Sequence, residues 1–235
     1  MNLWWLGSKD GQGNFGDILT PFIFDHFGIR YNWVHSYKDA DAICVGSIAR
    51  RASAKTIVLG SGIIKKGERV TPNSNWKFVR GPITRNRILE LGGKCPELYG
   101  DPALLLPLIY NPIIPQKYKL GYIPHNVDYG TIVNDYDNVI NLRTKNYKRV
   151  IDQILMCEAV VSSSLHGIIV AHAYGIPAAW VSSINPLKGD NVKFEDYFQS
   201  VGITDYTQST YDNPIFIKPG KIDLTPIIDI FKSLA

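Results

Sequence analysis

Short apolar runs alternate with amphipathic stretches along most of the chain, a pattern typical of parallel α/β units. In the first half, the pattern predicts strands at 3–7, 41–46, 56–60 and 76–79 and helices at 18–27 and 83–91. In the second half, it predicts strands at 120–124, 139–142, 159–162 and 178–181 and helices at 147–156, 165–174 and 194–201. The tail at 225–234 also has helical spacing, so the predicted fold class is α/β.

The alternation pauses where three prolines follow in close succession, at Pro107, Pro112 and Pro115. Proline lacks a backbone N–H and disfavours both a helix interior and a central strand. We therefore expect a linker at 108–118 between two Rossmann-like, doubly wound lobes at 1–107 and 119–220, followed by a C-terminal helix at 221–235. Sheets of this kind bind ligands in the crevice outside the carboxyl ends of their strands.

Composition narrows the classes of function. The 235 residues are 45% hydrophobic and 20% charged, which is usual for a soluble globular protein. The net charge of +4 is modest and dispersed, so it does not indicate nucleic-acid binding, whereas small anionic substrates suit it. No apolar run approaches the ~20 residues of a membrane span, and we expect a cytoplasmic chain. The 3 cysteines are scattered and lack CxxC spacing, which argues against a disulfide framework and against a metal site.

The junction between the predicted strand at 159–162 and the helix after it has the features of an anion site. Three serines, 162–164, lead through Leu165 and His166 into the helix, and Ser164 is placed to cap it. The first N–H groups of a helix have no intrahelical acceptor, and the helix dipole is positive there, so a phosphate or carboxylate can bind. A solvated first-turn histidine on an ordinary helix is the alternative interpretation of His166.

The segment 11–16 has the spacing GxGxxG of a dinucleotide-binding loop, but its context argues against that function. Polar residues separate it from the preceding strand, and Asp39 and Asp41 precede the next strand, whereas a ribose-binding acid should end it. Asn14 and Asp17 are interpreted instead either as caps of the following helix or as groups of the ligand site. The chain also lacks GxSxG and the Walker A motif.

Two arginines stand at predicted strand ends, one in each lobe. Arg80 follows the strand at 76–79 and should point toward the cleft, and Arg143 follows the strand at 139–142. Their forked, permanently charged side chains suit phosphate and carboxylate. Surface salt bridges are the alternative for either one alone.

Four further polar residues have positions in the sequence that bear on the site. His125 lies just past a strand end and could join the cleft or stabilise its loop. Lys193 heads a helix, an unusual place for a cation unless it serves a ligand or partner. An Asx turn suffices to explain Asp101, and packing is the better explanation for His172.

Four segments, in this order, resemble the polysaccharide pyruvyl transferase family: GNFGD at 13–17, VRGPIT at 79–84, GDPA at 100–103 and SSSLHGIIVA at 162–171. The resemblance implies two lobes similar to the GT-B glycosyltransferases, with the acceptor on the first lobe and the donor on the second. The implied reaction moves pyruvate from phosphoenolpyruvate (PEP) onto two hydroxyls of a sugar, giving a cyclic ketal and phosphate. The acceptor would be a sugar or lipid-linked glycan precursor of a surface or extracellular polysaccharide, and no resident cofactor is expected.

The resemblance and the chemistry of PEP together suggest roles for the site residues. His166 is the candidate general acid, and Asp17 is the candidate to orient or deprotonate the acceptor hydroxyl. Family members with arginine before the Leu-His pair use it on PEP, but this chain has Ser164 there. The residues expected to bind substrate are Asn14, Arg80, His125, Arg143, Ser164, Leu165 and Lys193.

Two other functions remain open at this point. A nucleotide-sugar glycosyltransferase would use the same fold, but such enzymes commonly place glutamates after the phosphate-binding helix, and this region offers only Glu195. A catalytically inactive sugar-binding protein is the second alternative, because the arginine is missing at Ser164.

Overall fold

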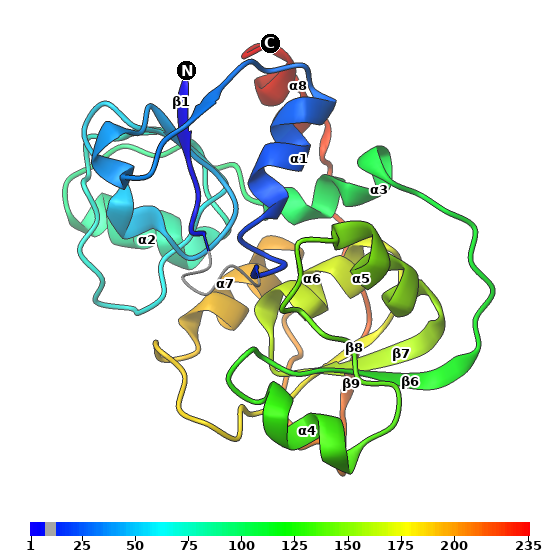
Figure 1. The fold of residues 1–235 in the computed structure, drawn as a ribbon. Coiled ribbons are helices and arrows are strands. Elements are labelled where there is room, and N and C mark those ends of the chain that lie inside the picture. Colours follow the sequence, from blue (N-terminus) through cyan, green and yellow to red (C-terminus); the bar gives the residue numbers. More distant parts are fainter. Residues whose placement is uncertain (8–12) are drawn as a thin grey trace.

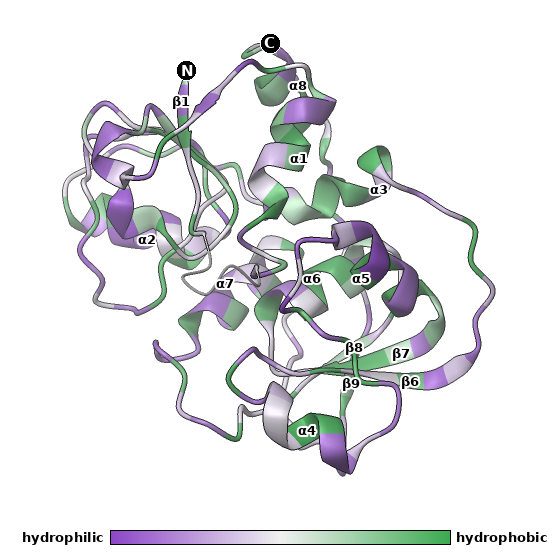
Figure 2. Cartoon of the chain, viewed as in Figure 1, coloured by the Kyte–Doolittle hydropathy of each residue, from purple (hydrophilic) through white to green (hydrophobic). Residues whose placement is uncertain are grey.

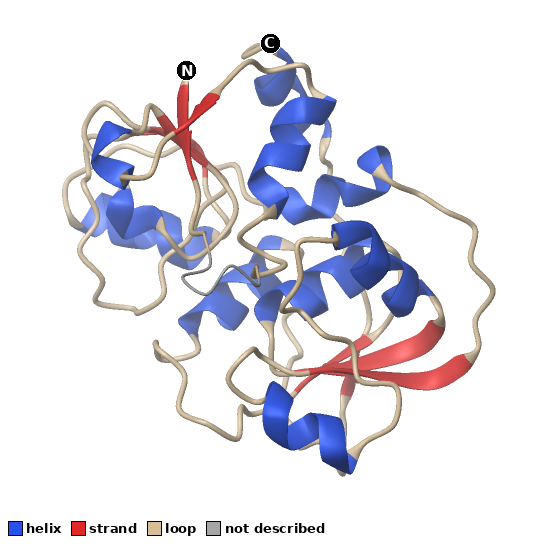
Figure 3. Cartoon of the chain, viewed as in Figure 1, coloured by secondary structure: helices blue, strands red, loops and turns tan. Residues whose placement is uncertain are grey.

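The computed structural model describes residues 1–7 and 13–235 and contains two β-sheets (Figures 1 and 3). The first sheet has the order β2-β1-β3-β4-β5, and all its strands pair in parallel. Its strands are β1 (Asn2–Trp4), β2 (Asn32–Trp33), β3 (Ala42–Ile43), β4 (Ile57–Leu59) and β5 (Asn75–Phe78). The fold is therefore α/β with parallel sheets, as the hydrophobic pattern predicts.

The second sheet has the order β6-β7-β8-β9, in which only β9 is antiparallel. Its strands are β6 (Tyr118–Ile123), β7 (Cys157–Ser162), β8 (Ala178–Trp180) and β9 (Phe216–Ile217). The helices are α1 (Leu19–His26), α2 (Pro82–Glu90), α3 (Leu106–Ile109), α4 (Tyr129–Asp135), α5 (Tyr147–Leu155), α6 (Leu165–Ala173), α7 (Val192–Ser200) and α8 (Thr225–Lys232). Short 3₁₀ turns are η1 (Tyr37–Asp39), η2 (Ala49–Arg51) and η3 (Pro102–Leu105).

Each sheet is covered on both faces. Successive side chains of a strand point to opposite faces, and Val160 and Val161 of β7 enter two different hydrophobic clusters. Leu3 and Trp4 of β1 divide in the same way. Figure 2 shows that α6 is hydrophobic along most of its length, whereas α5 has a polar outer face. This is why α6 can lie against the sheet and bring its first turn to the strand ends.

The largest cluster is continuous across the two sheets, because it includes Phe78 of β5 and Val160 of β7. The C-terminal helix α8 joins it at the first sheet. Phe231 of α8 stacks on Phe27 with 5.1 Å between ring centroids and contacts Phe24 and Phe78 edge-on. The predicted domain boundaries stay a prediction.

Several predicted elements need correction. Segment 139–142 is not a strand; Val139 makes only an isolated bridge to Tyr122, next to Asn138, whose φ is +55°. The prolines at 107–115 do not prevent a helix, since Pro107 occupies the first turn of α3, where a missing N–H costs nothing. Besides α3, the prediction missed β2, α4 and β9, which are short or lack clear periodicity. Among the described residues, no helix combines the length and the hydrophobicity needed to cross a membrane.

Candidate active site

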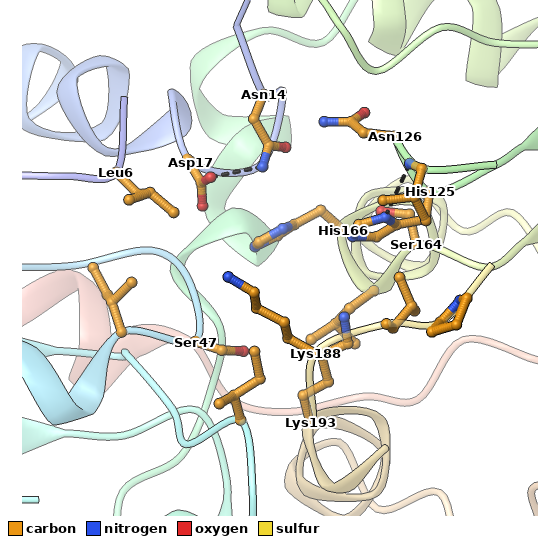
Figure 4. A pocket seen from close by; sticks show the side chains of 16 residues that line it. Leu6, Asn14, Asp17, Ser47, His125, Asn126, Ser164, His166, Lys188 and Lys193 are labelled. Carbon is orange, nitrogen blue, oxygen red and sulfur yellow. Dashed lines mark hydrogen bonds between the residues drawn. The ribbon is translucent and has the colours of Figure 1, made fainter. Parts of the chain in front are cut away.

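A cavity of about 350 Å³ is lined by segments that follow strands of both sheets. These segments follow β1, β3 and β4 in the first sheet and β6, β7 and β8 in the second, and α7 adds Lys193. Figure 4 shows Asn14 and Asp17 on one side of the cavity and His125 and His166 on another. The cavity thus lies outside the carboxyl ends of the strands, where the topology predicts a ligand site.

His166 lies in the first turn of α6 and lines the cavity with its ring 15% exposed. Burial, assisted by the nearby groups Lys193, Arg80 and His125, lowers the pKa of His166 to about 3. The imidazole is therefore neutral near pH 7 in the free protein. A bound anion must offset these effects before His166 can act as an acid.

The three serines before α6 have different roles. Ser162 Oγ accepts from the Ser164 N–H at 3.0 Å, and Ser163 Oγ accepts from the His125 N–H at 2.9 Å. Ser164 is the N-cap residue of α6, as expected, but its side chain makes no cap hydrogen bond. Its hydroxyl has no hydrogen bond to any described residue, and Ser164 lines the cavity with Leu165. A hydroxyl, the helix dipole and the first N–H groups of α6 are thus available to an anion.

Asn14 and Asp17 form a hydrogen-bonded pair on the opposite side of the cavity. Asn14 Nδ2 donates to Asp17 Oδ2 at 2.6 Å. They do not cap α1, whose N-cap is Ile18 with no side-chain bond. Burial raises the pKa of Asp17 to about 7, although the Asn14 hydrogen bond and the charge of Lys193 act to lower it. A carboxyl group with a pKa near 7 can both accept and donate a proton near neutral pH.

Lys193 brings a cation to the cavity from the first turn of α7. Burial and the charge of Arg80 lower the pKa of Lys193 to about 8, while Asp17 acts to raise it. The partial positive charge at a helix start disfavours a cation. An anion bound beside Lys193 would offset this repulsion.

Arg80 does not point into the cavity, and that expectation is wrong. Its side chain is 0% exposed, and Nε donates to Asp196 Oδ2 of α7 at 3.1 Å. Its other nitrogens donate to Ser47 Oγ and the Ile63 carbonyl, each at 2.7 Å. Asp196 also accepts from the N–H and hydroxyl of Thr84. The VRGPIT segment therefore anchors α7, which carries Lys193.

Arg143 and His125 belong to adjacent loops. Arg143 donates through Nε and Nη2 to the Asn126 carbonyl and lies over the Tyr129 ring, and it is not among the described residues that line the cavity. His125 does line it, and its Nδ1 accepts from the Val127 N–H at 3.4 Å. Burial, assisted by Lys193, lowers the pKa of His125 to about 4. His125 thus both joins the cavity and stabilises its loop.

Three polar residues of the cavity were missed from sequence: Ser47, Asn126 and Lys188. Each follows the carboxyl end of a strand, and that position was the signal that could have found them. Residues 11 and 12 of the GxGxxG segment lie outside the described residues. Within the described ranges, no group of three or more His, Cys, Asp or Glu side chains could hold a metal ion.

Comparison with known protein families matches residues 7–185 to Polysaccharide pyruvyl transferase. The chain belongs to this family. The matched residues include the cavity-lining residues from Asn14 to His166, whereas Leu6, the lining residues at 186–188 and Lys193 lie outside the match.

Two curated proteins are similar to this pyruvyl transferase family member over most of its length. Uncharacterized protein L143 of Acanthamoeba polyphaga mimivirus is 31% identical over 207 residues, covering 75% of this chain and 71% of that protein. Succinoglycan biosynthesis protein ExoV of Rhizobium meliloti (strain 1021) is 29% identical over 214 residues, covering 82% of this chain. The match spans 63% of ExoV, less than two thirds of its length. No solved structure matches the chain.

Proposed function

We propose that this protein transfers the pyruvyl group of PEP to a sugar of a polysaccharide precursor and forms a cyclic ketal, on a two-lobed GT-B-like scaffold. The observation that carries the proposal is the combination in one cavity of an uncapped helix start, a lysine and two proton-transfer groups on different sides, His166 and Asp17. PEP carries a phosphate and a carboxylate, and its reaction requires both protonation and deprotonation. Membership of the family supports the same choice.

In the proposed binding mode, the start of α6, the Ser164 hydroxyl and Lys193 hold the anionic groups of PEP. These negative charges favour the imidazolium form of His166, which then protonates the methylene carbon of the enol. The carbon that bears the phosphate becomes oxocarbenium-like. One sugar hydroxyl attacks it and gives its proton to Asp17.

The second half of the reaction breaks the bond between that carbon and the phosphate oxygen. Phosphate leaves with the bonding electron pair, and a second hydroxyl of the same sugar attacks and gives its proton to His166, which became neutral when it protonated the methylene carbon. The acceptor must therefore present two hydroxyls that can close a ring, such as those at positions 4 and 6 of a terminal hexose. Asn14 orients Asp17 toward this acceptor through their hydrogen bond.

Phosphate release tests the proposal. The protein is incubated with PEP and candidate glycans, phosphate is measured, and the product is examined by mass spectrometry for an acid-labile pyruvyl ketal. Thermal shift adds a binding test, since a ligand at 100 times its Kd stabilises by about 2.7 kcal/mol. Stabilisation by nucleoside diphosphates together with hexose transfer from a nucleotide sugar would establish the glycosyltransferase alternative. Glycan binding without phosphate release would establish an inactive sugar-binding protein.

Lys193→Met should weaken PEP binding by about 10- to 100-fold, because a hydrogen bond to a charged group contributes about 1.5–3 kcal/mol. Calorimetric titration of PEP measures the change. Lys119→Met is the matched control, since Lys119 is exposed on β6 and absent from the cavity lining. Equal PEP affinity in the wild type and Lys193→Met would exclude Lys193 as a ligand of the donor.

PEP affinity should also fall as pH rises from 7 to 9. The pKa of Asp17 is about 7 and that of Lys193 about 8, so rising pH first adds a negative charge to the cavity and then removes a positive one. In the free protein, His125 and His166 stay neutral over this range, because their pKa values are about 4 and about 3. Calorimetry across this pH range should show Kd rising by up to about tenfold per pH unit above 8 for one lost proton. In Lys193→Met the rise above pH 8 should be smaller than in the wild type, because the charge lost from Lys193 no longer contributes.

A further inference from the structure

Asp101, in the GDPA segment, is a buried carboxylate that the proposed reaction does not use. It is 1% exposed and caps the 3₁₀ turn η3, where Oδ1 accepts from the Ala103 N–H at 3.0 Å. The Asx turn expected from the sequence is thus present. It accounts for only one of the two carboxylate oxygens.

The second oxygen faces His166. Asp101 Oδ2 lies 3.9 Å from His166 Nε2. Both atoms are buried, and neither has a hydrogen-bond partner among the described residues. A buried polar atom without a partner is costly and rare, and here a carboxylate oxygen and an imidazole nitrogen are placed opposite each other.

Gly16 limits the His166 ring from another side. A Cβ at position 16 would overlap the ring at Nδ1, Cγ and Cε1. Gly16 is not among the described glycines with positive φ, so its backbone does not require glycine, and the missing side chain makes room for the ring. The ring is therefore confined between the GNFGD segment and the GDPA segment.

We propose that Asp101 is a positioning residue that holds the His166 ring with a proton on Nε2 and so leaves Nδ1 as the nitrogen that serves the substrate. The consequence for catalysis rests on the proposed function, but the tautomer does not. Among the described residues, the other charged or titratable groups around His166 are Lys193, Arg80 and His125, and Asp101 supplies a negative charge that favours an imidazolium there. Burial raises the pKa of Asp101 to about 6, which still leaves the carboxylate mostly ionised at pH 7.5.

Asp101→Asn is the informative variant, because asparagine keeps the oxygen that accepts from Ala103 and replaces the oxygen facing His166 by an NH₂ donor. Nitrogen-15 NMR of the five histidines reports the tautomer in the free protein, with the His166 signals assigned from a His166→Gln spectrum. The wild type should carry the proton on Nε2, and Asp101→Asn should carry it on Nδ1. Asp128→Asn is the matched control: Asp128 is a buried aspartate bonded to Ser163 and Ser183, and its loss should leave the His166 tautomer unchanged.

An Nδ1–H tautomer in the wild type would overturn the proposal even if the variant failed to fold. The same tautomer in the wild type and in folded Asp101→Asn would also overturn it. A tautomer switch in a protein that never releases phosphate from PEP would support the positioning role and contradict the proposed reaction.

With PEP as donor, Asp101→Asn should lower kcat by about 100-fold with little change in the KM for PEP, since a group that orients a general acid acts on the chemical step. In the wild type, activity should fall at high pH as the imidazolium of His166 loses its proton. In Asp101→Asn this fall should begin about one pH unit or more lower, because the negative charge of Asp101 no longer favours the imidazolium. A purely structural role would lower the amount of folded protein and leave the pH of this fall unchanged.

Discussion

His166→Ala is expected to reduce turnover of PEP by about 10²–10⁴-fold, the usual contribution of general acid catalysis. The ring is 15% exposed and makes no hydrogen bond to a described residue, so removing it should cost little stability. Phosphate release under saturating PEP measures the loss, and thermal unfolding checks that the variant is folded. More than about a tenth of wild-type turnover with unchanged melting would remove His166 from the mechanism.

His172→Ala is the matched control on the same helix. His172 is 5% exposed, and its ring nitrogens lie 3.1 Å from Tyr197 Oη and 3.2 Å from the Ile217 carbonyl. Its removal leaves these buried groups without a partner, at a cost of about 1–3 kcal/mol. This variant should therefore lose stability and keep its turnover per folded molecule. The opposite responses separate a histidine that reacts from one that packs.

Arg80→Met is expected to lower the free energy of unfolding by about 3–5 kcal/mol, because it leaves the buried charge of Asp196 without its partner. Both side chains are 0% exposed, and the pair joins the start of α2 to α7. Urea unfolding measures the loss. PEP affinity should also fall, since α7 carries Lys193, but only as a consequence of the lost anchor.

Arg143→Met provides the comparison for Arg80. Arg143 is partly exposed and bonds one carbonyl, that of Asn126, so its loss should cost about 1–2 kcal/mol. If Arg80→Met unfolds like the wild type and differs only in PEP affinity, Arg80 contacts the donor directly and its structural role is wrong.

The local sequence pattern was sufficient to predict most of the secondary structure and several of the residues that line the cavity. Hydrophobic periodicity placed α5 and α6 within one residue of their observed ends, because packing one face of a helix imposes a repeat that the sequence displays. Positions after strand ends indicated His166, Ser164 and His125, and a cation at the head of a helix indicated Lys193; all four line the cavity. Hydrophobic periodicity could not reveal short elements such as β2 and β9, since a strand of two residues displays no period.

By itself, the sequence determined the α/β class, the family motifs and the strand-to-helix junction at Ser164, all of which depend on neighbours in the chain. Only the tertiary structure decided which polar groups meet. Arg80 pairs with Asp196, 116 residues away, and Asp101 faces His166 from another element. Burial is likewise a property of the folded chain, and it moves the pKa of Asp17 to about 7 and that of Lys193 to about 8. A strand-end arginine has the same local signature whether it meets solvent, a ligand or a buried carboxylate, and only long-range packing distinguishes these environments.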